Sequence, residues 1–305
     1  MVILRMAAAA LIAVSGNGPS VAKKLKVVAT TPDFAALARE IGGDAVEFTA
    51  LAKPTEDPHY VDANPSHIVT LNRADVLIEG GAELEIGWLP PLLDGARNPK
   101  LAPGAPGRIS CSRGIQMLEV PATLDRSKGD IHAAGNPHYM MDPLNTKIVA
   151  ENIATAFAQL EPRSSEVFQA NLGRFTTALE ARLAGWQKLL ESFKGQRVVS
   201  YHNSWPYFSQ RFGLRVDLFL EPKPGIPPSP AHLAAVVAKM KDEKIRAIFV
   251  EPHLNRRTAE TVARSTGATV VEVSQFPGGF KGTESGYLAL MDANVRALAK
   301  ALSAQ

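Results

Sequence analysis

A long amphipathic segment in the middle of the sequence constrains the fold most. Residues 166–193 contain no proline, and their large apolar side chains recur at spacings of three and four: Phe168, Leu172, Phe175, Leu179, Leu183, Trp186, Leu190 and Phe193. A helix of this length extends for about 40 Å, which is more than one small lobe requires. The pattern predicts a rigid helix that joins two lobes. The alternative is an ordinary peripheral helix within one domain.

Short apolar runs alternate with helical patterns on both sides of this segment. The strand candidates are residues 24–30, 46–51, 75–79 and 108–111 before it, and 196–201, 215–220, 245–250 and 268–273 after it. Capping residues followed by proline, such as Asn64-Pro65, Asp142-Pro143 and Ser229-Pro230, indicate helix starts between the strands. A helical segment is also expected over residues 84–93, interrupted by Pro90 and Pro91.

Alternating strands and helices with short connections predict parallel sheets covered by helices. We therefore expect an α/β protein with two lobes, each built on a four-stranded, mainly parallel sheet flanked by helices. One long rigid backbone helix joins the lobes. The predicted boundaries are 23–163 for the N-terminal lobe, 164–194 for the linking helix and 195–305 for the C-terminal lobe.

The first 22 residues differ from the rest of the chain. Arg5 precedes an apolar run over residues 6–14, and Ser20 and Ala22 are small residues at the positions that a signal peptidase reads. The run is too short to span a bilayer, and a Gly-Asn-Gly-Pro break after it argues against a buried N-terminal helix. We predict a signal peptide over residues 1–22 that is cleaved before Lys23, and a periplasmic protein. No cysteine lies near this point, so we expect no lipid attachment there.

Composition excludes several classes of protein. The chain is 46% apolar and 21% charged, with material for two cores, and its net charge of +3 is dispersed. No basic block indicates nucleic-acid binding. Cys111 is the single cysteine, which excludes an intramolecular disulfide framework and a cysteine-rich zinc site. We expect it to be a buried small hydrophobe.

Three histidines stand on loops that follow predicted strands. His59 follows the second strand, His138 follows the fourth, and His202 follows the first strand of the second half. Ligands of open parallel sheets bind beyond the carboxyl ends of the strands, so two facing lobes can bring these rings to one ion. Neutral imidazole suits zinc, and three nitrogens with one further donor complete a tetrahedron. For each histidine considered alone, a structural or surface role is the better interpretation. Because all three stand at matching strand ends, a shared metal site becomes the better interpretation for the set.

The remaining histidines have weaker settings. His67 and His232 lie inside predicted helices and are expected on solvated faces. His132 lies in a polar loop over residues 125–134 and is a candidate for loose metal recruitment. His253 follows a strand and is a candidate to line the cleft.

An ordered series of motifs resembles the solute-binding proteins of ABC importers for zinc and manganese, the class with a long backbone helix. The resemblance covers nearly all of the chain after Lys23. It lies in Asp57-Pro-His-Tyr60, Ala74-Asp-Val-Leu-Ile78, Gly80-Gly-Ala-Glu-Leu84, Asn136-Pro-His-Tyr139, Tyr201-His202, Glu221-Pro222, Ile248-Phe-Val-Glu-Pro252 and Tyr287-Leu-Ala-Leu-Met291. Any one of these motifs is weak, whereas the ordered set is specific.

The resemblance implies a function and a ligand set. By position, His59, His138 and His202 match the first three metal ligands of such proteins, and a histidine at the third place is typical of the zinc-preferring subset. The expected function is the binding of Zn²⁺ in the periplasm and its delivery to an ABC permease in the inner membrane. We expect a monomer that is not an enzyme.

Two features depart from the pattern of this class. The usual fourth ligand is an aspartate after the last strand, but residues 273–279 contain no carboxylate. Water, Ser274, Gln275 and Glu56 are the candidates for that position. The long histidine-rich, acidic loop of zinc receptors is reduced here to a trace, Asp125, Asp130 and His132.

Two other functions compete with a zinc receptor. A manganese or iron receptor of the same class is the nearer one. The other is a three-histidine zinc hydrolase or hydratase with an open water position. Such an enzyme needs a general base, and the chain lacks both His-Glu-x-x-His and Gly-x-Ser-x-Gly motifs.

Overall fold

The computed structural model describes residues 24–123, 129 and 132–304, so the predicted signal peptide, Asp125 and Asp130 lie outside the described residues. The first lobe contains β1 (Leu25–Ala29), α1 (Pro32–Gly42), β2 (Val46–Ala50), α2 (Pro65–Arg73), β3 (Val76–Glu79), α3 (Leu89–Ala96), β4 (Arg108–Ser110) and α4 (Pro143–Leu160). The long helix α5 spans Ser165–Leu190. The second lobe contains β5 (Arg197–Ser200), α6 (Pro206–Phe212), β6 (Arg215–Phe219), α7 (Pro230–Asp242), β7 (Ala247–Val250), α8 (Arg256–Thr266), β8 (Thr269–Glu272) and α9 (Tyr287–Ser303).

The two sheets have the same topology. The strand order is β2-β1-β3-β4 in the first and β6-β5-β7-β8 in the second. Every pairing between these strands is parallel, in registers such as Leu25 opposite Val46 and Ala247 opposite Thr269. The predicted fold class is confirmed, because parallel neighbours require helical crossovers and the helices stand between the strands as expected.

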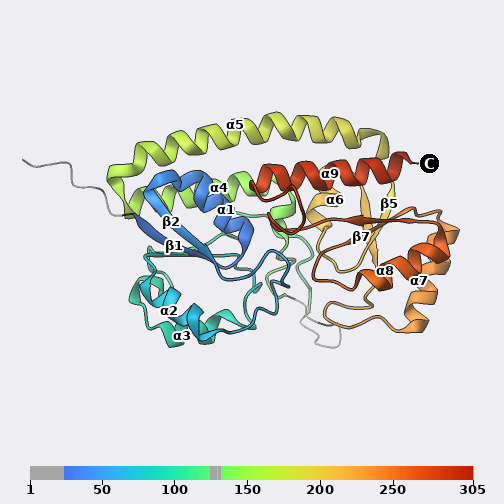
Figure 1. Cartoon of the computed structure of the whole chain (residues 1–305), viewed down its shortest axis with the longest axis horizontal. Coiled ribbons are helices and arrows are strands. Elements are labelled where there is room, and N and C mark those ends of the chain that lie inside the picture. Colours follow the sequence, from blue (N-terminus) through green and yellow to red (C-terminus); the bar gives the residue numbers. More distant parts are fainter. Residues whose placement is uncertain (1–23, 124–128, 130–131, 305) are drawn as a thin grey trace, which may run out of the picture.

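Helix α5 runs along both lobes (Figure 1). It packs on α1 and α4 of the first lobe and on α9 of the second. Its buried side chains include Phe168, Phe175, Leu179, Trp186 and Leu190, which are the predicted apolar stripe. The α-helix ends at Leu190, and a 3-10 turn continues to the predicted end at residue 193. The predicted domain boundaries around this helix stay a prediction.

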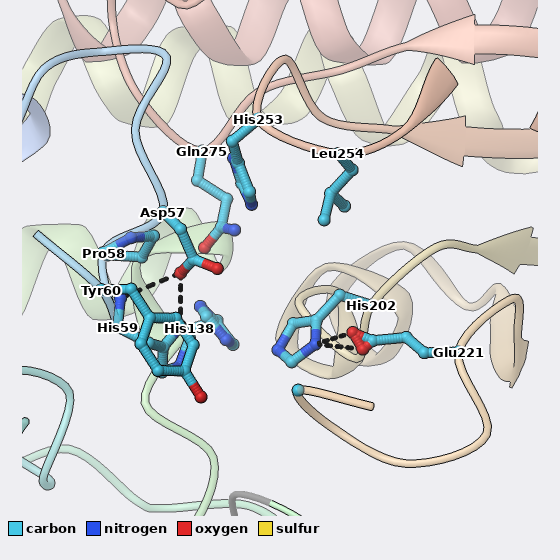
Figure 2. A pocket seen from close by; sticks show the side chains of 11 residues that line it. Asp57, Pro58, His59, Tyr60, His138, His202, Glu221, His253, Leu254 and Gln275 are labelled. Atoms are coloured by element: carbon cyan, nitrogen blue, oxygen red, sulfur yellow. Dashed lines mark hydrogen bonds and ion pairs between the residues drawn. The ribbon is translucent and has the colours of Figure 1, made fainter. Parts of the chain in front are cut away.

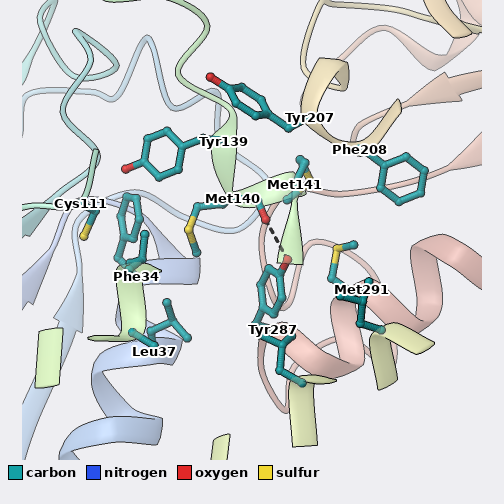
Figure 3. Packing of buried hydrophobic residues seen from close by; sticks show 14 of the residues in the cluster. Phe34, Leu37, Cys111, Tyr139, Met140, Met141, Tyr207, Phe208, Tyr287 and Met291 are labelled. Atoms are coloured by element: carbon teal, nitrogen blue, oxygen red, sulfur yellow. Dashed lines mark hydrogen bonds between the residues drawn. The ribbon is translucent and has the colours of Figure 1, made fainter. Parts of the chain in front are cut away.

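The central core is shared between the lobes. One cluster of buried side chains takes in the inner faces of both sheets, and Figure 3 shows Phe34 and Tyr139 of the first lobe in the same cluster as Tyr207, Phe208 and Tyr287 of the second. Smaller clusters lie beneath α2 and α3 on one outer face and beneath α7 and α8 on the other. The inner face of each sheet is covered by helices that also contact the other lobe, so the largest cluster is continuous across both lobes. Cys111 is fully buried in the shared core, as expected.

One predicted helix has different bounds. The segment before Leu89 forms turns rather than a helix, and α3 begins at Leu89 with Pro90 and Pro91 in its first turn. Proline is tolerated there because the first backbone N–H groups of a helix have no partner within the helix. The two prolines therefore start this helix instead of interrupting it. Within the described part of the chain, no helix combines the length and apolar character needed to cross a bilayer.

The shared core predicts little movement between the lobes. Opening the cleft widely would expose apolar side chains that both lobes bury together, and α5 resists bending between them. We expect small-angle scattering curves of the metal-free and metal-loaded protein to superimpose, with the same radius of gyration. A clearly larger metal-free particle would contradict this expectation.

Candidate metal centre

His59 is held by the loop that follows β2. The Asp57 Oδ1 atom accepts a hydrogen bond from the His59 backbone N–H at 2.9 Å and lies 3.0 Å from His59 Nδ1. Trp88 Nε1 donates to the Pro58 carbonyl at 2.9 Å, which fixes the same loop from the other side. Burial acts to raise the pKa of Asp57, but the hydrogen bond and charge of His59, and then His253, outweigh it and lower the pKa to about 2. Because Asp57 occupies Nδ1, His59 Nε2 is left for a ligand.

His138 is held by a turn ahead of α4. Its backbone N–H donates to Asn136 Oδ1 at 3.0 Å, and a 3-10 turn over Tyr139–Met141 leads to Asp142, which caps α4. The His138 residue is only 5% exposed. Burial, followed by repulsion from the other histidines, holds its pKa well below the ordinary value for histidine. The ring is therefore neutral at physiological pH, which is the form that binds metal.

His202 is held by a carboxylate from the neighbouring strand. Its Nδ1 atom lies 3.0 and 3.2 Å from the two carboxylate oxygens of Glu221, which follows β6. Burial acts to lower the pKa of His202, but the hydrogen bond and charge of Glu221, then Glu251 and Asp57, outweigh it and raise the pKa. The Glu221 contact leaves Nε2 of His202 as the nitrogen available to an ion.

The structure brings these three rings together at one point between the lobes (Figure 2). A ligand nitrogen from each of His59, His138 and His202 lies within 4.8 Å of the other two. The ring centroids are 5.1 Å apart for His59 and His138, 5.5 Å for His59 and His202, and 5.4 Å for His138 and His202. Nitrogens on a tetrahedral zinc lie about 3.4 Å apart, so small side-chain shifts suffice to form a shared site. Their role as ligands stays a prediction.

The rings border a small cavity at the carboxyl ends of the strands. Its volume is about 40 Å³, and loops that follow β2, β5, β6, β7 and β8 supply its lining together with His138. Sites for drug-sized ligands have volumes of about 300–1,000 Å³, whereas a single water needs only about 10–15 Å³. The cavity therefore suits one ion with a water and is too small for an organic substrate.

The candidates for a fourth ligand are not equally placed. Gln275 lines the cavity, and its side chain hydrogen-bonds His138. The Ser274 hydroxyl is engaged with the Phe276 backbone, donating to the carbonyl at 3.1 Å and accepting from the N–H at 3.0 Å. Glu56 accepts a hydrogen bond from the Lys53 N–H at 3.0 Å. Neither Ser274 nor Glu56 lines the cavity, so Gln275 and water remain.

The other histidines divide into two groups. His253 lines the cavity, as expected from its position after β7. His132 lies beside the site, with its ring centroid 5.2 Å from that of His59, and it borders an adjoining cavity of about 90 Å³. The predicted recruitment of metal by His132 stays a prediction.

The expectation of solvated faces was wrong for His67 and His232. Both are half-buried. His232 Nε2 lies 3.0 Å from the Phe219 carbonyl, and His67 Nδ1 is buried with no hydrogen-bond partner among the described residues. Helical position alone does not decide exposure, because these helices pack against the sheets.

Sequence reasoning missed the residues that orient the histidines. Asp57 and Glu221 belong to motifs that were recognised, but neither was assigned a role. Asp57 was detectable as an Asp-Pro-His turn, in which a carboxylate reaches the residue two positions ahead. Glu221 was harder to detect, since it reaches His202 only through the pairing of β6 with β5.

Relatives of this chain are receptors of metal importers. The iron ABC transporter substrate-binding lipoprotein MtsA of Streptococcus pyogenes serotype M1 is 26% identical over 267 residues, which cover 85% of this chain and 83% of MtsA. The manganese ABC transporter substrate-binding lipoprotein PsaA of Streptococcus pneumoniae serotype 4 is 23% identical over 253 residues, covering 81% and 79%. A crystal structure of ZnuA shares the fold, with a TM-score of 0.78 at 23% identity, covering 92% of this chain and 99% of that one.

A family model gives the broadest match. The model of the periplasmic component A of the zinc-uptake complex matches residues 27–301. Proteins of this family are substrate-binding proteins of metal ABC transporters rather than enzymes, and they work with a membrane permease and its ATPase. With this match over nearly the whole chain, the protein belongs to the family of the zinc-uptake complex component A.

Proposed function

We propose that this protein binds Zn²⁺ through His59, His138 and His202 and delivers it to an ABC importer. The observation that carries the proposal is a set of three imidazole nitrogens within 4.8 Å of one another at the edge of a cavity of about 40 Å³. Imidazole favours zinc, whereas manganese favours sites rich in carboxylate and water oxygens. The donor set therefore supports zinc as the cargo.

The charges around the site also suit a divalent cation. Three neutral imidazoles bring no charge to the ion, while Asp57 and Glu221 each place a carboxylate on the Nδ1 atom of a ligand. Such carboxylate–histidine–metal arrangements fix the ring orientation and raise the basicity of the ligand nitrogen. We propose that a water takes the fourth position beside Gln275. An exchangeable fourth ligand suits a protein that must release its cargo.

Location and partners follow from the same proposal. We propose that residues 1–22 are a cleaved signal peptide, so that the mature protein is free in the periplasm. Relatives named as lipoproteins differ in this respect from the expectation for this chain. The proposed partner is an ABC permease in the inner membrane, which the protein meets as a monomer. Nucleic acid is not a proposed partner, given the dispersed charge of the chain.

The second candidate cargo is manganese or iron, which is favoured by the names of MtsA and PsaA. A competition experiment separates the candidates. Metal-free protein is dialysed against equal concentrations of zinc and manganese, and the bound metals are measured by mass spectrometry. We expect zinc to occupy the site with little manganese, following the preference of nitrogen ligands. Retention of manganese in the presence of zinc would contradict the assignment.

A further inference from the structure

Glu119 has an unusual backbone conformation next to the metal centre. It follows β4 in the first lobe, and its φ of 56° lies in the left-handed region. Residues other than glycine, asparagine and aspartate seldom adopt this conformation, and they keep it where surrounding contacts compensate for the strain. The side chain of Glu119 contacts the two loops that carry His138 and His202.

One carboxylate oxygen of Glu119 joins these loops across the lobes. Its Oε2 atom accepts hydrogen bonds from Asn136 Nδ2 at 3.0 Å and from Asn203 Nδ2 at 2.7 Å. Asn136 lies two residues before His138, and its Nδ2 also donates to the Asn203 carbonyl at 2.9 Å. Asn203 directly follows His202. The contact therefore links a loop of the first lobe to a loop of the second at the positions next to two metal-site histidines.

The backbone around Glu119 is tied to the same place. The Leu118 N–H donates to the Tyr207 hydroxyl at 2.9 Å, and that hydroxyl donates to the Asn136 carbonyl at 2.8 Å. The Asn136 N–H in turn donates to the Leu118 carbonyl at 2.8 Å. Tyr207 belongs to α6 of the second lobe and is 1% exposed. These bonds fix the backbone at Leu118, directly before Glu119, whereas the Glu119 residue itself is exposed.

The orientation of the Asn203 amide is consistent with this role. Its Oδ1 atom is buried without a hydrogen-bond partner among the described residues. Turning the amide over would set this oxygen against the Glu119 carboxylate, so the contact to Glu119 selects the observed orientation.

We propose that Glu119 is a positioning residue that sets the spacing between His138 and His202 and thereby the affinity for metal. The proposal rests on the proposed function, since it concerns the same site. Glu119 does not line the cavity of the three histidines. It acts on the metal only through Asn136 and Asn203. Without it, the two loops keep the direct bond from Asn136 Nδ2 to the Asn203 carbonyl but lose the carboxylate that fixes both amide groups.

Two variants of Glu119 test the proposal. Glu119→Gln keeps an oxygen that can accept both amide hydrogens, so we expect its zinc dissociation constant to stay within about threefold of the parent value. Glu119→Gly removes the side chain at a left-handed position that glycine adopts freely, and we expect the dissociation constant to rise about tenfold. Affinities are measured by competition with a chelator, and the fold is checked by thermal unfolding of the metal-free proteins.

The visible spectrum of the cobalt-substituted protein supplies a readout that stability alone does not move. We expect the Glu119→Gln spectrum to match the parent and the Glu119→Gly spectrum to change, because the ligand geometry changes. Asn203→Ala should weaken binding as much as Glu119→Gly, and the double variant should bind no worse than either.

Two outcomes would overturn the proposal. Parent-like affinity and spectrum in Glu119→Gly would show that the contact does not position the ligands. An equal loss in Glu119→Gln and Glu119→Gly would show that the carboxylate acts through its charge. A wrong proposed function would be distinguished from a wrong role for Glu119, because the parent protein itself would then fail to bind zinc. If the parent prefers manganese, the same comparison made with manganese still tests Glu119.

Discussion

His138→Ala is expected to lower zinc affinity by about 10²–10³-fold. Structural zinc sites with four protein ligands bind with about 10–16 kcal/mol, so one ligand accounts for roughly 3 kcal/mol. His138 is the most buried of the three rings, and its depressed pKa keeps it neutral and ready to bind. Affinity is measured by chelator competition at pH 7.5, and metal content after dialysis gives an independent value.

His232→Ala is the matched control for this variant. His232 is half-buried, and its ring lies 3.0 Å from the Phe219 carbonyl, but it lies on α7 and does not line the cavity of the three rings. We expect its zinc affinity to equal that of the parent. A His138→Ala protein that unfolds at the parent temperature without metal and still binds zinc tightly would refute the proposed ligand set.

Glu221→Gln is expected to lower zinc affinity at pH 8 by about 10- to 100-fold, the range found for partners of metal-bound histidines. The amide can still accept from His202 Nδ1, so the ring keeps its orientation and loses only the negative charge behind it. The matched control is Glu243→Gln, because Glu243 pairs with Arg197 and Lys239 far from the cavity. Its zinc affinity should match that of the parent.

The same variant should change the dependence of affinity on pH. Glu221 raises the pKa of His202, so protons compete for this ligand as the pH falls through that raised value, above the ordinary 6.5. In Glu221→Gln the pKa returns toward the ordinary value, and the fall in affinity begins at a lower pH. Parent affinity that stays flat from pH 8 to pH 5 would contradict this explanation.

The stability of the metal-free protein gives a second test of whether Glu221 raises the pKa of His202. A histidine whose pKa is raised by folding stabilises the native state at pH values below its unfolded pKa of about 6.5. That stabilisation is lost as the pH rises through the higher folded pKa. We therefore expect the unfolding free energy of the parent to exceed that of Glu221→Gln at pH 6 by more than at pH 8, as measured by urea denaturation of metal-free protein.

Local patterns in the sequence determined most of the fold. The strands, the capping prolines of α2, α4 and α7, and the stripe of α5 are all short-range signals, because helices and strands repeat every few residues. Parallel topology followed from the alternation of these elements. The meeting of His59, His138 and His202 was also predictable in outline, since each follows a strand and parallel strands present their carboxyl ends at one edge.

Only the tertiary structure decided how the lobes meet and what supports the ligands. Glu221 contacts His202, and Glu119 joins Asn136 to Asn203. The two residues in each of these contacts are between 17 and 84 positions apart in the sequence. The shared core likewise depends on which faces the helices cover. No periodicity encodes such contacts, because they arise from the packing of elements that lie far apart along the chain. The sequence alone therefore determined the elements and candidate ligands, whereas folding in three dimensions decided the geometry and protonation of the site.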